Sequence, residues 1–375
     1  MKEERTVDGS TTTVQYGVEY TLTVKGFDTT VNQVKIKIPA GLVTDNSGNG
    51  NKETDLVLYN TLKPTYTGTY DEETNSESKE TSPFLGNTKI QRQNIDNITF
   101  MNNIPANVGY DETTQSYKDS TTWDVSAEQD KSILAWYTTN ANGSLKVYIG
   151  SDSEIFANQD STDLFAYIGK GDKCISTETI TNIDLLNVNS VTNMYRMFRY
   201  TGYKSMKKLE LGSKFDTSNV TNMKEMFEST GYTAMTDINL GANFNTSKVT
   251  DMSNMFKNSG YTKLTGLNLG TEFDTTKVIY MNGMFNATGY TEMTTFELND
   301  GFNTSNVTDM SQMFYQTGSK KLKTLNLKDG FNTAKVTNMS EMFKEMEALT
   351  KLDLKGKFDT SKVTNMSGMF WGTGS

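Results

Sequence analysis

A methionine–phenylalanine pair recurs through the second half of the chain at an almost constant spacing. The phenylalanines of the seven pairs lie 29 residues apart, except for a last interval of 27, and are Phe198, Phe227, Phe256, Phe285, Phe314, Phe343 and Phe370. Self-similarity with a period of about 20 to 50 residues is typical of stacked structural units. We therefore expect residues 183–375 to form seven stacked units with these phenylalanines as the structural core.

Each unit contains a segment with the apolar spacing of a short helix. Met223, Met226 and Phe227 lie at positions i, i+3 and i+4, which would place them on one helical face. Asn222 is the expected N-cap, and Glu225 completes a capping-box pattern. A helix of about eight residues is too short to be stable alone. The pattern therefore predicts a helix that neighbouring units hold in place.

An alternating segment follows in every unit and predicts a short strand. Ile238 and Leu240 represent it, and the equivalent pairs are Leu209/Leu211, Leu267/Leu269, Phe296/Leu298, Leu325/Leu327 and Leu352/Leu354. Equivalent strands that are separated by crossovers should run in parallel. A short parallel strand plus a short helix in each unit predicts an α/β solenoid of the leucine-rich-repeat type.

The repeated block resembles a known family. The pattern F-[DN]-T-S-x-V-T-[ND]-M-x-x-M-F followed by L-x-L is similar to the BspA-like bacterial leucine-rich-repeat surface proteins and lipoproteins. Segments 123–126, 133–136, 147–151 and 164–165 resemble the β-rich region that precedes such repeats. The resemblance implies a β-rich N-terminal cap over residues 89–182, an extracellular or cell-surface location, and a role in adhesion.

The N-terminal residues have a different character. Residues 20–24 and 34–38 alternate like half-buried strands, and residues 39–49 resemble the closing turn of a bacterial immunoglobulin-like module. Such a sandwich needs about 100 residues, so we expect residues 1–55 to be part of an all-β module. Residues 56–88 are expected to form a polar, acidic linker. Because no apolar leader follows Met1, we expect a signal and an anchor to lie outside this fragment.

Composition limits the possible functions. The net charge of −9 argues against nucleic acid as a partner. No apolar run is long enough for a membrane span. The chain has no histidine and one cysteine, Cys174, which removes Ser-His-Asp catalysis, histidine-containing zinc sites and an internal disulfide. We expect no catalytic residue, no metal and no cofactor. A glycoside hydrolase with paired carboxylates stays open as a remote alternative.

Three features could bind a ligand. The first is a ladder of tyrosines spaced 29 residues apart: Tyr203, Tyr232, Tyr261 and Tyr290. The rings could serve as apolar contacts at helix ends, or as an aromatic stripe for glycans or peptides. The second is a ladder of Asp or Asn residues, each followed by Thr, at positions 216, 245, 274, 303, 332 and 359. Stacked Asx turns explain it, and a Ca²⁺-binding row is the alternative. The third is Asp45, Asn46 and Asn49, either a plain turn or a Ca²⁺ turn.

These observations predict a non-enzymatic surface protein whose repeats bind an extracellular protein or glycan. A structural spacer that displays another domain is the alternative. The exposed positions beside the strands vary from unit to unit, for example Lys207-Lys208, Thr236-Asp237 and Thr265-Gly266. Near-identical exposed residues would favour a spacer, so this variation favours binding.

Overall fold

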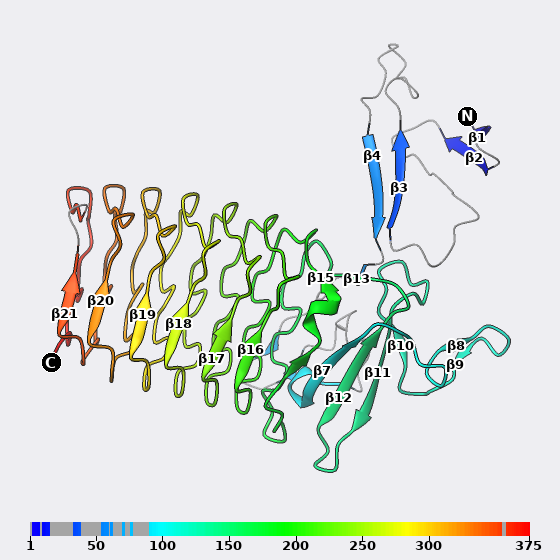
Figure 1. Ribbon diagram of the computed structural model, residues 1–375, viewed down its shortest axis with the longest axis horizontal. Coiled ribbons are helices and arrows are strands. Elements are labelled where there is room, and N and C mark those ends of the chain that lie inside the picture. Colours follow the sequence, from blue (N-terminus) through cyan, green and yellow to red (C-terminus); the bar gives the residue numbers. More distant parts are fainter. Residues whose placement is uncertain are drawn as a thin grey trace. The chain divides into compact units, whose positions relative to one another are not determined.

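The computed structural model describes residues 2–7, 10–15, 33–38, 54–59, 61–62, 70–71, 76–77, 90–354 and 358–375. The chain divides into two compact units, Met1–Asn60 and Thr61–Ser375. The first unit contains two antiparallel pairs, which are β1 (Lys2–Val7) with β2 (Ser10–Gln15) and β3 (Gln33–Ile38) with β4 (Thr54–Tyr59) (Figure 1).

Only part of the prediction for the N-terminal residues falls on residues that the structure describes. The strand expected over 34–38 coincides with β3. The strand expected over 20–24 and the turn with Asp45, Asn46 and Asn49 lie outside the described residues. Within the expected linker, β5 (Tyr70–Asp71) pairs with β6 (Ser76–Glu77). The immunoglobulin-like module therefore stays a prediction.

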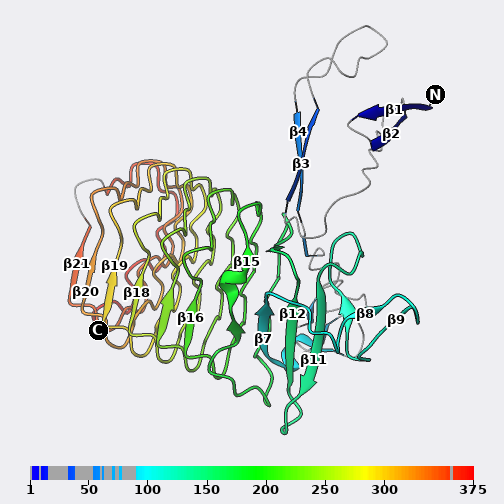
Figure 2. The ribbon, with the colours of Figure 1, turned by 45° about the vertical axis from the view of Figure 1, so that its right-hand side comes forward.

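The second unit begins with a five-stranded sheet of order β10-β11-β12-β7-β14. Its members are β7 (Ile95–Met101), β10 (Trp123–Asp124), β11 (Leu134–Thr139), β12 (Leu145–Gly150) and β14 (Ile180–Thr181). Figure 2 shows β7, β11 and β12 side by side. The 3₁₀ turn η1 (Arg92–Asn94) precedes β7, and β8 (Tyr110–Asp111) forms a hairpin with β9 (Ser116–Tyr117).

The segment between this sheet and the repeats already stacks like a repeat. The short strand β13 (Ile155–Phe156) pairs in parallel with β15 (Leu186–Asn187), which follows the 3₁₀ turn η2 (Ile183–Leu185). Asp160 bridges to Asn193, and the ring of Phe165 stacks on that of Phe198 with 5.3 Å between centroids. The motif Leu-Phe-x-Tyr at 164–167 is thus a degenerate copy of Met-Phe that the sequence pattern missed.

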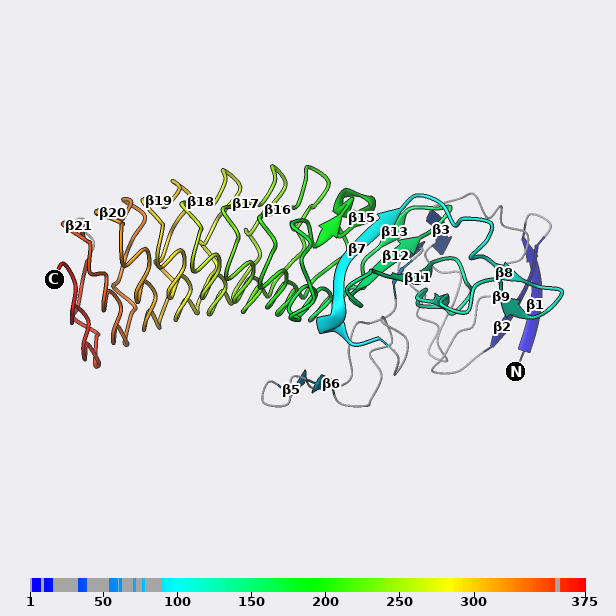
Figure 3. The same ribbon diagram turned by 90° about the horizontal axis from the view of Figure 1, so that it is seen from below.

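Six three-residue strands mark the repeats that follow. They are β16 (Lys208–Glu210), β17 (Asp237–Asn239), β18 (Gly266–Asn268), β19 (Thr295–Glu297), β20 (Thr324–Asn326) and β21 (Lys351–Asp353). They lie in chain order along the stacked repeats (Figure 3). All pairing is parallel, as expected, but the strands pair two by two, β16–β17, β18–β19 and β20–β21, rather than as one six-stranded sheet.

The predicted fold class is wrong. The second unit is not an α/β solenoid with short helices, because its described residues contain no α-helix, only short strands, isolated bridges, turns and two 3₁₀ turns. The expected helix at Met223 is a series of β-turns in which Glu225, Ser229 and Gly231 have φ near +56°. Met226 N–H donates to the Met223 carbonyl at 3.2 Å, which is an i to i−3 bond. The protein is β-rich.

The backbone hydrogen bonds explain why no helix forms. Met223 N–H donates to the Asp251 carbonyl of the next repeat at 3.1 Å, and Phe227 N–H donates to the Met255 carbonyl at 2.8 Å. An α-helix would direct these donors to carbonyls within the same segment. Because eight residues make only a marginal helix, bonds to the neighbouring repeat prevail. The expected capping box fails for the same reason, since Asn222 instead accepts from Lys224 N–H in an Asx turn.

The apolar positions form one continuous core from Leu62 to Met369. The repeat phenylalanines stack face to face, with ring centroids 5.2 Å apart for Phe227–Phe256 and 5.8 Å for Phe256–Phe285. Those from Phe198 to Phe343 are fully buried, whereas Phe370 is 46% exposed. The first Met of each repeat is fully buried as well, apart from Met366 in the last repeat. The i, i+3, i+4 spacing therefore marks the core even though it does not mark a helix.

A buried arginine closes the stack at its N-terminal side. Alternate N–H groups of each repeat donate to the next repeat, so the carbonyls of Leu164 and Ala166 face backwards. Arg92 is 2% exposed, and its Nη1 donates to the carbonyls of Asp163 (2.6 Å), Leu164 (3.2 Å) and Ala166 (3.2 Å). The guanidinium thus supplies a donor to the carbonyls of Leu164 and Ala166, and adds a second donor to that of Asp163, which also accepts from Ala166 N–H.

Candidate binding surface

The six strands β16–β21 present an outward face with two rows of side chains, which we call the strand face. The middle residue of each strand points into the core, and the two flanking residues point out. The first outward row is Lys208, Asp237, Gly266, Thr295, Thr324 and Lys351. The second row is Glu210, Asn239, Asn268, Glu297, Asn326 and Asp353. The first row changes its chemical character from repeat to repeat, whereas the second row contains only carboxylates and amides.

An open hollow of about 420 Å³ lies on this face over β17, β18 and β19. Gly266 lies on β18, the middle of these three strands, and Asp237 and Thr295 are its neighbours on β17 and β19. A Cβ at Gly266 would come within 2.5 Å of Thr295 Oγ1, so the threonine leans over the glycine. Hydroxyl, amide and carboxylate groups line the hollow, which suits a ligand that forms many hydrogen bonds.

The tyrosine ladder lies at a different corner of each repeat. Its four rings stack on one another with centroids 4.8, 4.6 and 4.7 Å apart along Tyr203, Tyr232, Tyr261 and Tyr290. Lys320 Nζ covers the far side of Tyr290 at 5.2 Å from the ring centroid. All four side chains are half-buried. A ligand can therefore reach ring edges and hydroxyls but not the ring faces of Tyr232 and Tyr261.

Burial also changes the chemistry of the ladder. It raises the pKa of Tyr232 to about 12, with a further contribution from the neighbouring Tyr261. The pKa of Tyr261 is raised for the same first reason. These hydroxyls stay protonated at neutral pH, so the ladder offers hydrogen-bond donors and acceptors rather than negative charge.

The Asp/Asn-Thr ladder forms Asx turns, in agreement with the first of its two interpretations. Asp216 Oδ1 accepts from Ser218 N–H at 2.9 Å, and Asp274 Oδ1 accepts from Thr276 N–H at 2.8 Å. The following threonines point into the stack, where Thr217 Oγ1 donates to the Asn245 carbonyl at 2.8 Å. Among the described residues no three acidic or cysteine side chains gather around a common point that could hold a metal ion.

Charged residues pair across the first repeats. Arg196 Nε donates to Glu225 at 2.6 Å and Arg199 Nε to Glu228 at 2.7 Å, each 29 residues apart. Glu225 and Glu228 are buried. The arginine and the glutamate of each pair occupy equivalent positions in adjacent repeats. The sequence therefore predicts these ion pairs only once the repeats are known to stack. In each pair the arginine supplies a donor and a positive charge to the buried carboxylate, and the pair links two adjacent repeats.

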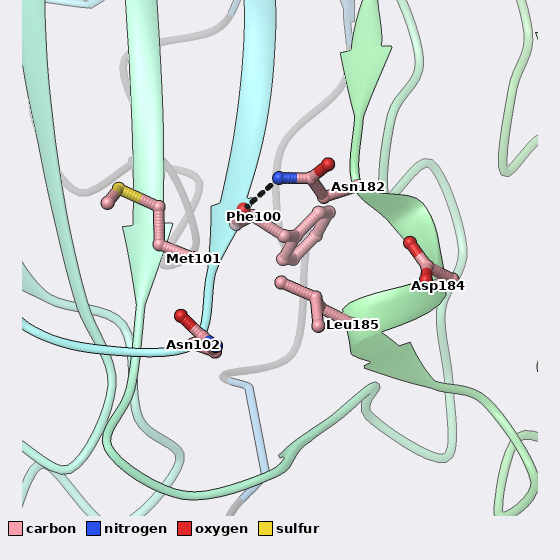
Figure 4. A pocket seen from close by; sticks show the side chains of 6 residues that line it. All are labelled: Phe100, Met101, Asn102, Asn182, Asp184 and Leu185. Atoms are coloured by element: carbon pink, nitrogen blue, oxygen red, sulfur yellow. Dashed lines mark hydrogen bonds between the residues drawn. The ribbon is translucent and has the colours of Figure 1, made fainter.

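A second, smaller hollow of about 320 Å³ lies where the five-stranded sheet meets the repeats. Figure 4 shows its lining, in which Asn182, Asp184 and Leu185 come from one segment and Phe100, Met101 and Asn102 from another; Asn182 Nδ2 joins the two by donating to the Phe100 carbonyl at 3.1 Å. Three of the six lining residues are apolar and three are polar. Asn182 is already engaged in joining the sheet to the repeats, so the hollow marks a junction between two parts of the core.

Comparison with known proteins locates the repeats within a family. A family model described as "Mycoplasma protein of unknown function, DUF285" matches residues 172–296, 232–325 and 290–375. No match was found among curated proteins or among solved structures. In the part of the chain that the structure describes, no helix has the length and apolar character needed to cross a membrane. Because the three matches together span residues 172–375, more than half of the chain, the protein belongs to the DUF285 family.

Proposed function

We propose that the protein is a non-enzymatic, extracellular surface protein of the BspA-like type, and that its repeats bind an extracellular ligand through the strand face. The observation that carries this proposal is the contrast between the two sides of each strand. The inward position is a large apolar residue in every strand, namely Leu209, Ile238, Leu267, Phe296, Leu325 and Leu352. The outward first row changes in charge and size, from Lys208 to Asp237 to Gly266.

This contrast has a physical reason. The inward side chains must fill a core of fixed dimensions, so they can vary little. Outward side chains have no such requirement, and a pure spacer would be served by any soluble residue repeated along the face. A surface that recognises a ligand needs a particular pattern of donors, acceptors and charges. The hollow around Gly266 is the place on the face where such groups converge.

The ligand is an extracellular protein or a glycan. The polar lining of the hollow supports hydrogen bonding to either, because both present donors and acceptors. The tyrosine ladder stays a second candidate for contact, limited to the edges and hydroxyls of Tyr203, Tyr232, Tyr261 and Tyr290. The resemblance to BspA-like proteins and the DUF285 membership support a surface location and adhesion.

An array of glycans and extracellular-matrix proteins, probed with the full chain, tests this proposal. Thr295→Arg fills the hollow with a long charged side chain, and Thr324→Arg makes the same change at the equivalent exposed position of the next strand. We expect a component that binds the wild-type chain to lose affinity for Thr295→Arg and to keep it for Thr324→Arg. Equal binding by both variants would place the ligand elsewhere, and binding to no component would favour the structural spacer.

A further inference from the structure

The hollow on the strand face carries negative charge. Asp237 on β17 and Glu297 on β19 both line it, and both side chains are exposed. Its other lining residues are threonine, glycine, asparagine and two buried apolar residues, so the lining contains no lysine or arginine. Within the described part of the chain neither carboxylate takes part in an ion pair or a hydrogen bond. The hollow therefore presents two carboxylates that no group of the protein neutralises.

The backbone beneath the hollow also has groups without a partner. Where two strands pair, the residue before the second strand donates to the preceding repeat. Thr236 N–H does so to the Lys207 carbonyl at 2.9 Å, and Thr294 N–H does so to the Thr265 carbonyl at 2.9 Å. The strands β17 and β18 do not pair. Consequently, among the described residues, Thr265 N–H has no acceptor and the Thr236 carbonyl has no donor.

This gap coincides with the hollow, because Thr236 and Thr265 both belong to its lining. The hollow therefore offers one backbone donor and one backbone acceptor, which together match the two groups of a peptide unit. The strands β19 and β20 are unpaired as well. The first-row residues there are Thr295 and Thr324, so that gap lacks the glycine and the aspartate that lie beside the first one.

Lysines stand on both sides of the hollow along the stack. Lys207 and Lys208 lie at the start of β16, and Lys323 directly precedes β20. Lys208 is the neighbour of Asp237 in the register of β16 and β17, yet no ion pair joins these two described residues. The charge of the face thus changes from positive to negative and back to positive. A partner with one positive group between neutral or acidic groups is complementary to this order, whereas a polybasic partner is repelled at both ends.

We propose, on the basis of the function proposed above for the strand face, that its ligand is a protein and that the hollow binds a lysine or arginine side chain from an extended segment of that protein. The basic group lies between Asp237 and Glu297. The peptide units of the segment pair with Thr265 N–H and the Thr236 carbonyl. Arginine suits the hollow better than lysine, because its planar guanidinium can donate to more than one carboxylate at once.

The charges favour a protein over a glycan. A neutral sugar can bond to the threonine and asparagine groups but leaves both carboxylates without a positive partner, and an acidic sugar is repelled by them. A lysine or arginine side chain supplies the missing charge and forms charge-assisted hydrogen bonds. The strands β17 and β19 are about 10 Å apart, at two strand spacings. That separation leaves room for one basic group with a carboxylate on each side.

A pair of short peptides tests the proposal with the full chain. The first has one arginine between serines and glycines, with both ends blocked, and the second has citrulline in place of arginine. Citrulline keeps the shape of arginine and lacks its charge. In a titration to about 10 mM, followed by saturation-transfer NMR, the arginine peptide should bind about tenfold more tightly than the citrulline peptide. Raising the salt from about 50 to about 500 mM should reduce this preference. An arginine peptide that binds no more tightly than the citrulline peptide would overturn the proposal.

Neutral variants of the two carboxylates locate the site. Asp237→Asn and Glu297→Gln keep the shape of each side chain, and each should raise the dissociation constant of the arginine peptide about three- to tenfold. Glu210→Gln is the matched control, since Glu210 is in the same row as Glu297, is exposed, and lies outside the lining of the hollow. It should leave binding unchanged, and thermal unfolding should be the same for all three variants. An equal loss with Glu210→Gln would show a general attraction to an acidic chain and would refute the site.

The same variants separate this proposal from the function on which it rests. A component of the array that loses affinity for Thr295→Arg and for the combined Asp237→Asn and Glu297→Gln chain supports both. A component that is sensitive to Thr295→Arg but binds the combined variant as tightly as the wild type keeps the strand face as a binding site and overturns the basic side chain as its ligand. A glycan that depends on Thr295 has the same consequence. A component that binds Thr295→Arg unchanged removes the basis of both proposals.

Discussion

The stack of phenylalanines allows the same Phe→Ala substitution to be compared at a buried site and at a partly exposed site. Phe256 is fully buried between Phe227 and Phe285, at centroid distances of 5.2 and 5.8 Å. Phe370 occupies the equivalent position in the last repeat, is 46% exposed, and stacks only on Phe343 at 5.5 Å. Replacing each by alanine removes the same atoms from a closed site and from an open one.

The two sites predict different losses of unfolding free energy. Removing a fully buried phenylalanine costs the transfer of its apolar surface and leaves a cavity, about 3–5 kcal/mol in all. At Phe370 roughly half of the surface already contacts water, so about half of the 1.5–3 kcal/mol transfer contribution is lost. Solvent can fill the space there, so no closed cavity remains. We therefore expect Phe256→Ala to cost about 3–5 kcal/mol and Phe370→Ala about 0.8–1.5 kcal/mol.

Urea denaturation followed by tryptophan fluorescence and circular dichroism measures both losses. The transition midpoint should fall strongly for Phe256→Ala and weakly for Phe370→Ala. Hydrogen exchange should show the lost protection of Phe256→Ala concentrated in the repeats on either side, because each repeat bonds to its neighbours. Equal losses for the two variants, or a loss below 1 kcal/mol for Phe256→Ala, would refute the stacked core.

Three further substitutions probe the buried charge and the tyrosine ladder. Arg92→Met leaves the carbonyls of Leu164 and Ala166 without a donor and should lower the unfolding free energy by about 2–4 kcal/mol, measured by urea denaturation; a loss within error would mean that water replaces the guanidinium. Burial raises the pKa of Asp163 to about 6, although Arg92 lowers it. The protonated carboxyl therefore contributes stability that is fully present below about pH 4 and is lost as the pH rises through 6. The unfolding free energy of Asp163→Asn should rise relative to that of the wild type between pH 4 and pH 7, and a difference that is constant with pH would contradict the shift. Replacing Tyr232, Tyr261 and Tyr290 together by serine should lower the melting temperature, because each stacked pair contributes about 0.5–1.5 kcal/mol. Replacing the same three residues by phenylalanine keeps the stacking and should not lower it. An unchanged melting temperature for the serine variant would show that the ladder is free for a ligand.

The repeat spacing predicted which residues would be buried but not how the backbone would run. Met223, Met226 and Phe227 are fully buried at the positions that the spacing marked. A separation of three or four residues brings side chains together in a helix, and here a series of β-turns does the same. Single-sequence patterns do not distinguish the two conformations, because the deciding hydrogen bonds go to a segment 28 residues away, such as Met223 to Asp251.

The candidate sites divide in a similar way. The tyrosine ladder and the Asx turns could be found from their spacing alone, because each is a single position that recurs. The hollow around Gly266 could not, since it depends on how β17, β18 and β19 lie beside one another. The role of Arg92 was also invisible, because its carbonyl partners begin 71 residues further along the chain.

The sequence by itself determined the period and the inward positions, because each is a property of residues compared at a fixed spacing. The tertiary structure decided whether a repeat would be helical, which ring faces stay covered, and how the first carbonyls are satisfied. These depend on contacts between repeats, and a segment too short to be stable alone takes the conformation that its neighbours' hydrogen bonds favour.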